Sequence, residues 1–141
     1  MNDTINLVGE IKVLLNNKVV LEKKNLIVQV GKNFLASAVI NSSASPFNAM
    51  AIGTGTTAAS TADTALQTEV ARAAFTTGTV STNVVSLSNT YVAGTGTGAI
   101  TEAGIFNNAT SGGTMLSHVV FSAINKGAAD TLTINWTITV G

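Results

Sequence analysis

The sequence contains no cysteine and only one histidine, His118, among its 141 residues. Without cysteine the chain can form neither a disulfide framework nor a zinc–thiolate site, and catalysis by a thiolate is excluded. One histidine cannot provide a cluster of histidine ligands within one chain. A lone histidine inside a β pattern is most often a surface or hydrogen-bonded residue. We therefore expect no metal site, no cofactor and no catalytic role for His118.

Charged residues are also scarce. Seven Lys and Arg balance seven Asp and Glu, and together they make up 10% of the chain, against about 25% in typical domains. This balance argues against a surface that binds nucleic acid. Because the cores of protein interfaces are depleted of charge, the composition also suggests that part of the surface is buried in an assembly.

A long apolar run is absent as well, although the mean hydropathy is +0.40. No segment approaches the ~20 apolar residues of a membrane-spanning helix. The first residues, MNDTINLVGE, have neither the basic segment nor the apolar segment of a signal peptide. We therefore expect no membrane association and no export signal at this end of the chain.

Few residue patterns suggest catalysis. Asp63, Glu69 and Glu102 could supply the two carboxylates of a glycosidase, but one Trp and one Tyr offer little aromatic platform for a sugar. No nucleophile elbow surrounds His118, and the acidic residues form no calcium loop. The glycine-rich segments 53–55 and 94–98 lack the motifs of phosphate-binding loops and are predicted to be turns. The chain is therefore predicted not to be an enzyme.

What the sequence does contain is a clear β pattern, strongest in residues 131–140 (TLTINWTITV). Apolar residues alternate strictly with Thr and Asn, as in a half-buried strand. A slip of one residue would bring the only Trp into water, so the register of this strand should be tightly specified. The residues predicted to anchor the core are Trp136, Ile134, Phe106 and Phe121.

Further strand patterns run through most of the chain and are separated by turn signals. They lie at residues 5–15, 18–28, 50–55, 73–83, 84–94, 100–106 and 115–122. Between them, the apolar spacing at residues 30–40 predicts one short helix. The pattern predicts an all-β domain, either an antiparallel β-sandwich or a jelly-roll-like fold. Residues 1–141 should form a single domain, with residues 1–30 as an N-terminal arm or hairpin.

The densest polar segment is residues 60–72 (STADTALQTEVAR). Asp63 could cap a single helical turn, with Glu69 and Arg72 three residues apart on one side. An exposed pair of this kind would contribute less than ~1 kcal/mol. Because a planar guanidinium suits buried pairing, we predict instead that Arg72 is buried against Glu69 or Glu102, with Asp63 as a further candidate.

Several motifs resemble those of bacteriophage virion structural proteins. They are residues 52–57 (IGTGTT), 63–66 (DTAL) with Glu69 and Arg72, 100–107 (ITEAGIFN), 113–116 (GTML), Phe121 with residues 124–127 (INKG), and residues 130–133 (DTLT) with Trp136. The resemblance covers about residues 50–140, and the residues that carry it look structural. At Ala103 the chain departs from the branched residue usual in such proteins, so packing there should be looser. Similar modules occur in head decoration proteins and in tail or fibre proteins.

The resemblance implies a capsid decoration, or cement, protein on the surface of the virion, made in the host cytoplasm. It would bind the outside of the major capsid protein lattice as a homo-oligomer, with a trimer expected, and stabilise the head. The candidate capsid contacts are Asn2, Asp3, Lys12, Lys18, Lys23 and Lys24. The same lysines could instead protect the edge of a hairpin from aggregation.

The alternative is a phage tail or fibre module that binds a host surface glycan. Its candidate surface is the row of Thr and Asn side chains in residues 131–139. That row could equally be an ordinary solvent face or line a neighbouring subunit.

Overall fold

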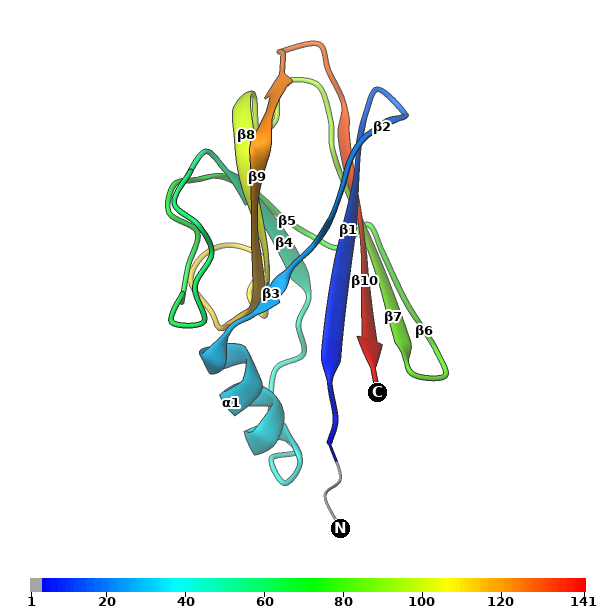
Figure 1. The fold of residues 1–141 in the computed structure, drawn as a ribbon, viewed down its shortest axis with the longest axis vertical. Helices are drawn as coiled ribbons and strands as arrows, with labels where there is room; N and C mark the ends of the chain where they lie inside the picture. The colour runs from blue at the N-terminus through cyan, green and yellow to red at the C-terminus, as the bar shows by residue number, and fades with distance from the viewer. Residues whose placement is uncertain (1–3) are drawn as a thin grey trace.

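A computed structural model, which describes residues 4–141, shows two five-stranded antiparallel sheets packed face to face (Figure 1). The first sheet has the order β2–β1–β10–β7–β6, and the second has the order β3–β9–β8–β4–β5. The all-β sandwich with one short helix is thus confirmed. No helix within residues 4–141 is long and apolar enough to cross a membrane.

The first sheet is built around the most regular strand of the sequence. Its strands are β2 (Lys18–Lys24), β1 (Leu7–Leu15), β10 (Leu132–Val140), β7 (Val84–Tyr91) and β6 (Thr77–Ser81). The central strand β10 pairs with β1 on one side and with β7 on the other. Ile134 and Trp136 are fully buried while Asn135 is exposed, so the alternation read from the sequence sets which face of β10 meets the core.

The opening hairpin is part of this sheet and not a separate arm. β1 pairs with β10 over its whole length, and its residues Ile11 and Val13 have no exposed surface. The turn to β2 passes through Asn16 and Asn17, whose φ angles are 50° and 67°. Positive φ at two successive residues matches the twist of a tight hairpin, and Asn tolerates it well.

The second sheet contains β3 (Leu26–Ile27), β9 (Met115–Lys126), β8 (Gly98–Phe106), β4 (Ala49–Gly53) and β5 (Glu69–Ala74). The helix α1 (Gln29–Ala38) follows β3 and lies at the end of the sandwich where β1 begins and β10 ends (Figure 1). The inner face of this sheet joins the main core, which contains Trp136, Ile134 and Phe121. The predicted anchor Phe106 is buried elsewhere, in a second cluster with Val28 and Leu66.

This second cluster lies on the outer face of the second sheet, because successive residues of a strand point to opposite faces. Ile105 belongs to the main core and its neighbour Phe106 to the second cluster. The connection from β4 to β5, residues 54–68, contributes Leu66 to this cluster. We call this segment the 54–68 loop. It holds a turn at residues 60–63 and no helical turn, so the helical turn predicted after Asp63 is wrong.

Candidate functional site

The most concentrated polar chemistry of the described chain surrounds Glu102, which is fully buried on the outer face of β8. Its Oε1 accepts hydrogen bonds from the backbone N–H groups of Gly55 and Thr68, at 2.9 and 2.8 Å. Its Oε2 accepts one from the Gln67 N–H at 3.0 Å and lies 2.8 Å from Nε2 of His118. One carboxylate thus joins both ends of the 54–68 loop to the sheet.

His118, on β9, continues this network and has no exposed surface. Its Nε2 contacts Glu102, and its Nδ1 lies 2.7 Å from Oδ2 of Asp63 in the 54–68 loop. A neutral imidazole has only one N–H, so it can donate to only one of two ionised carboxylates. The doubly protonated ring satisfies both contacts. We name Asp63, His118 and Glu102 the carboxylate–histidine cluster.

The hydrogen bonds of the cluster favour ionised carboxylates. Burial by itself would raise the pKa of Glu102, but the N–H groups of Thr68 and Gln67, together with His118 and Gly55, hold the pKa below its usual value. The same holds for Asp63: desolvation opposes ionisation, whereas the Ser60 N–H and the His118 ring outweigh it and lower the pKa. Both side chains are therefore acceptors at neutral pH.

These lowered pKa values predict a loss of stability in acid. A carboxylate whose pKa is lower in the folded state contributes stability above its unfolded pKa, which is about 4. That contribution is lost as the pH falls through the folded pKa. We expect the free energy of unfolding, measured with urea between pH 7 and pH 3, to fall more steeply for the wild type than for Glu102→Gln. The exposed Glu10→Gln is the control and should retain the wild-type slope; equal slopes for all three proteins would contradict the prediction.

The arrangement suits a structural clamp. Both ring nitrogens of His118 are engaged by carboxylates, so neither is free to accept a proton from a bound molecule. Within residues 4–141 there is no group of three or more His, Cys, Asp or Glu side chains placed to hold a metal ion. What the cluster does chemically is to hold the 54–68 loop against the sheet.

Arg72 on β5 forms a second, separate clamp. Its guanidinium makes a forked pair with Glu69, with Nε–Oε2 and Nη2–Oε1 distances of 3.1 and 2.7 Å. Nη1 donates to the carbonyls of Asn108 and Gly112 at 2.9 and 2.7 Å, and the group lies 3.9 Å from the ring centroid of Phe106. Only 5% of the Arg72 side chain is exposed. Arg72 therefore fastens the turn between β8 and β9.

The four ion-pair candidates of the sequence thus divide between two clamps. Arg72 pairs with Glu69, while Glu102 and Asp63 both bind His118. The position of His118 was missed because a lone histidine carries no pairing signal. The register of the β8–β9 hairpin could have revealed this pairing. Gly104 lies opposite His118, so Glu102, two residues away on the same strand face, lies diagonally beside the His118 ring.

A second residue that sequence reasoning missed is Lys126, at the end of β9. It is 1% exposed, and its Nζ donates to the carbonyl of Val92 at 3.0 Å. Val92 follows β7 of the first sheet, so this bond links the two sheets at one end of the sandwich. Tyr91 makes a similar link, since its hydroxyl donates to the carbonyl of Met50 on β4 at 2.7 Å.

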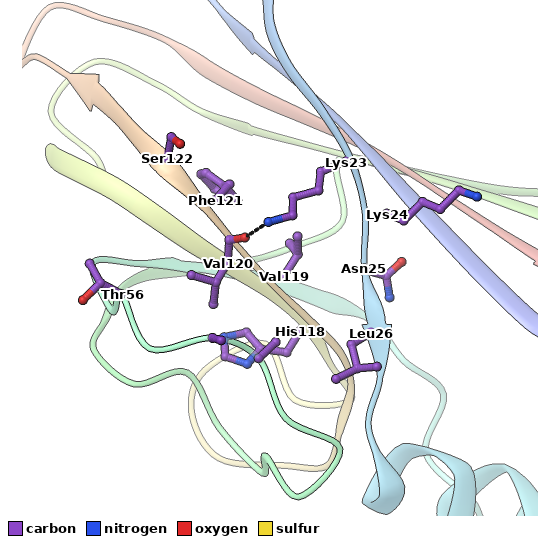
Figure 2. A pocket seen from close by; sticks show the side chains of 12 residues that line it. Lys23, Lys24, Asn25, Leu26, Thr56, His118, Val119, Val120, Phe121 and Ser122 are labelled. Carbon is purple, nitrogen blue, oxygen red and sulfur yellow. Dashed lines mark hydrogen bonds between the residues drawn. The ribbon is translucent and has the colours of Figure 1, made fainter.

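A groove of about 580 Å³ lies between β2, at the edge of the first sheet, and β9 of the second sheet, next to the short pairing of β9 with β3 (Figure 2). Residues 23–26 form one wall and residues 118–122 of β9 form the other, with Thr56, Ala58 and Ala59 of the 54–68 loop beside them. Lys23 and Lys24 are the lysines among its lining residues, and the Lys24 side chain points away from β9 (Figure 2). Lys23 spans the groove, since its Nζ donates to the carbonyl of Val120 at 2.6 Å.

The lysines predicted as capsid contacts lie on the opening hairpin. Lys12, Lys18, Lys23 and Lys24 are all exposed. The Nζ of Lys12 lies 3.3 Å from the Glu22 carboxylate across the hairpin. Asn2 and Asp3, the other two candidates, lie outside the described residues.

Apolar side chains gather at the end of the sandwich that holds α1, the start of β1 and the end of β10. A hollow of about 510 Å³ is lined by Ile5, Leu7, Lys32, Leu35, Ala36 and Val140. Of these, Ile5 is 76% exposed. The residues that follow α1, Val39 and Ile40, are 82% and 92% exposed. We call this pocket, with the six residues that line it, the apolar hollow.

Comparisons of the chain with protein-family models, with curated proteins and with solved structures found no match.

Proposed function

We propose that this protein is a phage capsid decoration protein that binds the outside of the major capsid protein lattice as a homo-oligomer, expected to be a trimer. The observation that carries the proposal is the apolar hollow, with exposed Val39 and Ile40 next to it along the chain. Apolar surface of this kind at one end of a domain marks an interaction site. In this proposal, other copies of the same chain bury the apolar hollow.

Three further features support a role in assembly. The motifs in residues 50–140 resemble those of phage virion proteins. Charged residues make up only 10% of the chain, as suits a surface that is largely covered. The buried ionic groups fasten loops to the sheet and offer no free acid or base to a substrate. A rigid β-sandwich with these properties acts through its surface.

The mechanism of stabilisation would be avidity. Each copy in a trimer would add modest contacts to the capsid lattice, and linked copies bind with effective concentrations in the millimolar range. Opening the shell would require these contacts to break together. The exposed lysines of the hairpin, Lys12, Lys18, Lys23 and Lys24, are the proposed contacts to the major capsid protein.

The first test is the native mass of the purified chain by light scattering. We expect an oligomer, with three copies as the specific expectation, and we expect Leu35→Asp to convert it to a monomer because a buried unpaired charge is costly. Val20→Asp is the control, since Val20 is also half-exposed but lies on β2, away from the apolar hollow. A monodisperse monomer at high concentration would contradict the proposed assembly.

A second measurement tests the capsid partner. The oligomer should sediment with capsids that lack decoration protein and should raise the temperature at which these capsids open. A hairpin variant with Lys12 and Lys18 changed to Glu should keep its native mass and lose sedimentation if these lysines make the contact. If the variant sediments as the wild type does, the hairpin does not meet the shell.

A further inference from the structure

The strand β6 forms one edge of the first sheet and lies at one side of the sandwich (Figure 1). All five of its residues, TGTVS, are exposed, and Val80 is 71% exposed. They belong to residues 73–101, a segment without Lys, Arg, Asp or Glu. Charged side chains and proline are the usual protection of an edge strand against pairing with another chain. β6 has neither, so its edge is open to a further strand.

The other edges of the sandwich carry charged side chains. β2 ends in Lys23 and Lys24, whose charges protect this edge. At the edge beside β3, the Nζ of Lys23 already donates to the carbonyl of Val120 on β9. β5 contains the ion pair of Glu69 and Arg72. Among the edges of the described residues, β6 is therefore the one best suited to accept another strand.

The pairing of β6 with β7 shows which backbone groups of β6 face the open side. Ser81 and Val84 flank a two-residue turn and form a hydrogen-bonded pair. Hydrogen-bonded and non-hydrogen-bonded pairs alternate along an antiparallel ladder. Thr79 therefore also directs its N–H and C=O groups to β7, whereas Gly78 and Val80 direct theirs to the open side. Each of these two residues thus presents both a donor and an acceptor at the edge.

These groups are complementary to those of a second copy of the same strand. When two β6 strands lie antiparallel about a two-fold axis at Thr79, Gly78 of each copy faces Val80 of the other. Each such pair exchanges both of its N–H···O=C bonds, so every outward backbone group of Gly78 and Val80 finds a partner. The two Thr79 side chains meet at the axis, where paired threonines can form a hydrogen bond.

The side chains fit the same register. Gly78 and Val80 lie on the core-facing side of β6, opposite Leu87 and Val85 of β7. A Cβ atom on Gly78 would lie 3.4 Å from Leu87 Cδ2 and 3.9 Å from Phe75 Cδ2, so apolar groups border the space that the glycine leaves open. The exposed Val80 of the second copy would fill this space. A glycine within a strand often marks the close approach of another backbone.

We propose that two copies of the chain associate through β6, which joins their first sheets into one continuous antiparallel sheet. The same patch serves both copies, as a two-fold contact requires, and the absence of charge removes electrostatic repulsion between them. Such a short contact is weak between free molecules, but it adds strength when the copies are already held together. No residue of β6 lines the apolar hollow, so the inference goes beyond the proposed function and does not depend on it.

Disulfide trapping tests this contact, since the chain has no cysteine of its own. In Thr79→Cys the two Cα atoms at the axis would lie about 4.5 Å apart, as in a non-hydrogen-bonded pair, and a disulfide can span that distance. Thr77→Cys is the control, because Thr77 is exposed on the same face of β6 but its two copies would be about 14 Å apart. With oxidised glutathione, the covalent dimer of Thr79→Cys should form at least ~10-fold faster than that of Thr77→Cys.

A mixture of two variants tests the register. Thr77 of one copy should face Ser81 of the other. Thr77→Cys mixed with Ser81→Cys should therefore give a mixed covalent dimer, although each variant alone is trapped slowly. The mixed dimer is identified by mass spectrometry of the disulfide-linked peptides.

Further variants separate this contact from random collision and from the apolar hollow. Val80→Lys should slow the trapping of Thr79→Cys about tenfold, because a charge on an edge strand opposes pairing. Val20→Lys is the control, since it makes the same change at an exposed position of β2, and it should leave the rate unchanged. In Leu35→Asp, Thr79→Cys should still be trapped faster than Thr77→Cys, so failure of the proposed assembly and failure of the β6 contact are distinguishable.

Three results would each overturn the proposal. They are equal trapping rates for Thr79→Cys and Thr77→Cys, no mixed dimer of Thr77→Cys with Ser81→Cys, and a rate that Val80→Lys does not change.

Discussion

Replacing Glu102 by Ala should lower the free energy of unfolding at pH 7 by about 3–5 kcal/mol, the usual cost of removing one partner of a buried ionic group. The substitution leaves the N–H groups of Gly55, Gln67 and Thr68 without their acceptor. It also leaves His118 buried beside a single carboxylate, that of Asp63. The measurement is urea unfolding followed by the fluorescence of the only Trp.

Two further variants define the cause of this loss. Glu102→Gln keeps the shape and one oxygen acceptor but removes the charge, so its destabilisation should be smaller than that of Glu102→Ala. Glu10→Ala, at an exposed position on β1, should change the free energy of unfolding by less than ~0.5 kcal/mol. If Glu102→Ala behaves as Glu10→Ala does, then the four hydrogen bonds of Glu102 contribute little to the fold.

The effect should be local before it is global. In Glu102→Gln, amide hydrogen exchange should accelerate in the 54–68 loop, whose N–H groups the carboxylate holds, while β10 should remain protected. Regions of low local stability open without global unfolding. Uniform acceleration across both sheets would show instead that the carboxylate–histidine cluster supports the sandwich as a whole.

The fold could be predicted from the sequence because strands and tight turns are specified by residues that are close together in the chain. In β10 the alternation of apolar residues with Thr and Asn alone predicts a half-buried strand, and the structure buries Ile134 and Trp136 accordingly. The successive Asn16 and Asn17 likewise predict the first hairpin, since both residues tolerate positive φ. Strand pattern and turn chemistry do not depend on distant parts of the chain.

The polar clamps could not be predicted in the same way. The partners Asp63, Glu102 and His118 are far apart in sequence and meet only because the 54–68 loop folds back over the β8–β9 hairpin. The spacing of residues 60–72 favoured a helical turn, yet the Asp63 carboxylate binds the Ser60 N–H and His118 instead. Tertiary pairing outweighed a local propensity that is worth only a fraction of a kcal/mol per residue.

Replacing Arg72 by Ala should destabilise the protein by about 2–4 kcal/mol, the range expected when buried groups lose a charged hydrogen-bond partner. Most of the loss should come from the carbonyls of Asn108 and Gly112, which lose their donor, and from the vacated space over Phe106. Glu69 contributes less, because 32% of its side chain is exposed and water can solvate it.

A lysine at this position separates charge from geometry. Arg72→Lys keeps the positive charge, but one ammonium cannot reproduce the planar fork to Glu69 together with the bonds to two carbonyls. We therefore expect Arg72→Lys to recover less than half of the stability lost in Arg72→Ala, measured by urea unfolding at pH 7. Lys18→Ala, an exposed cation on β2 and away from the apolar hollow, is the matched control and should be close to neutral. Full recovery by lysine would mean that charge alone holds the β8–β9 turn, and the directional bonds to its carbonyls would then be dispensable.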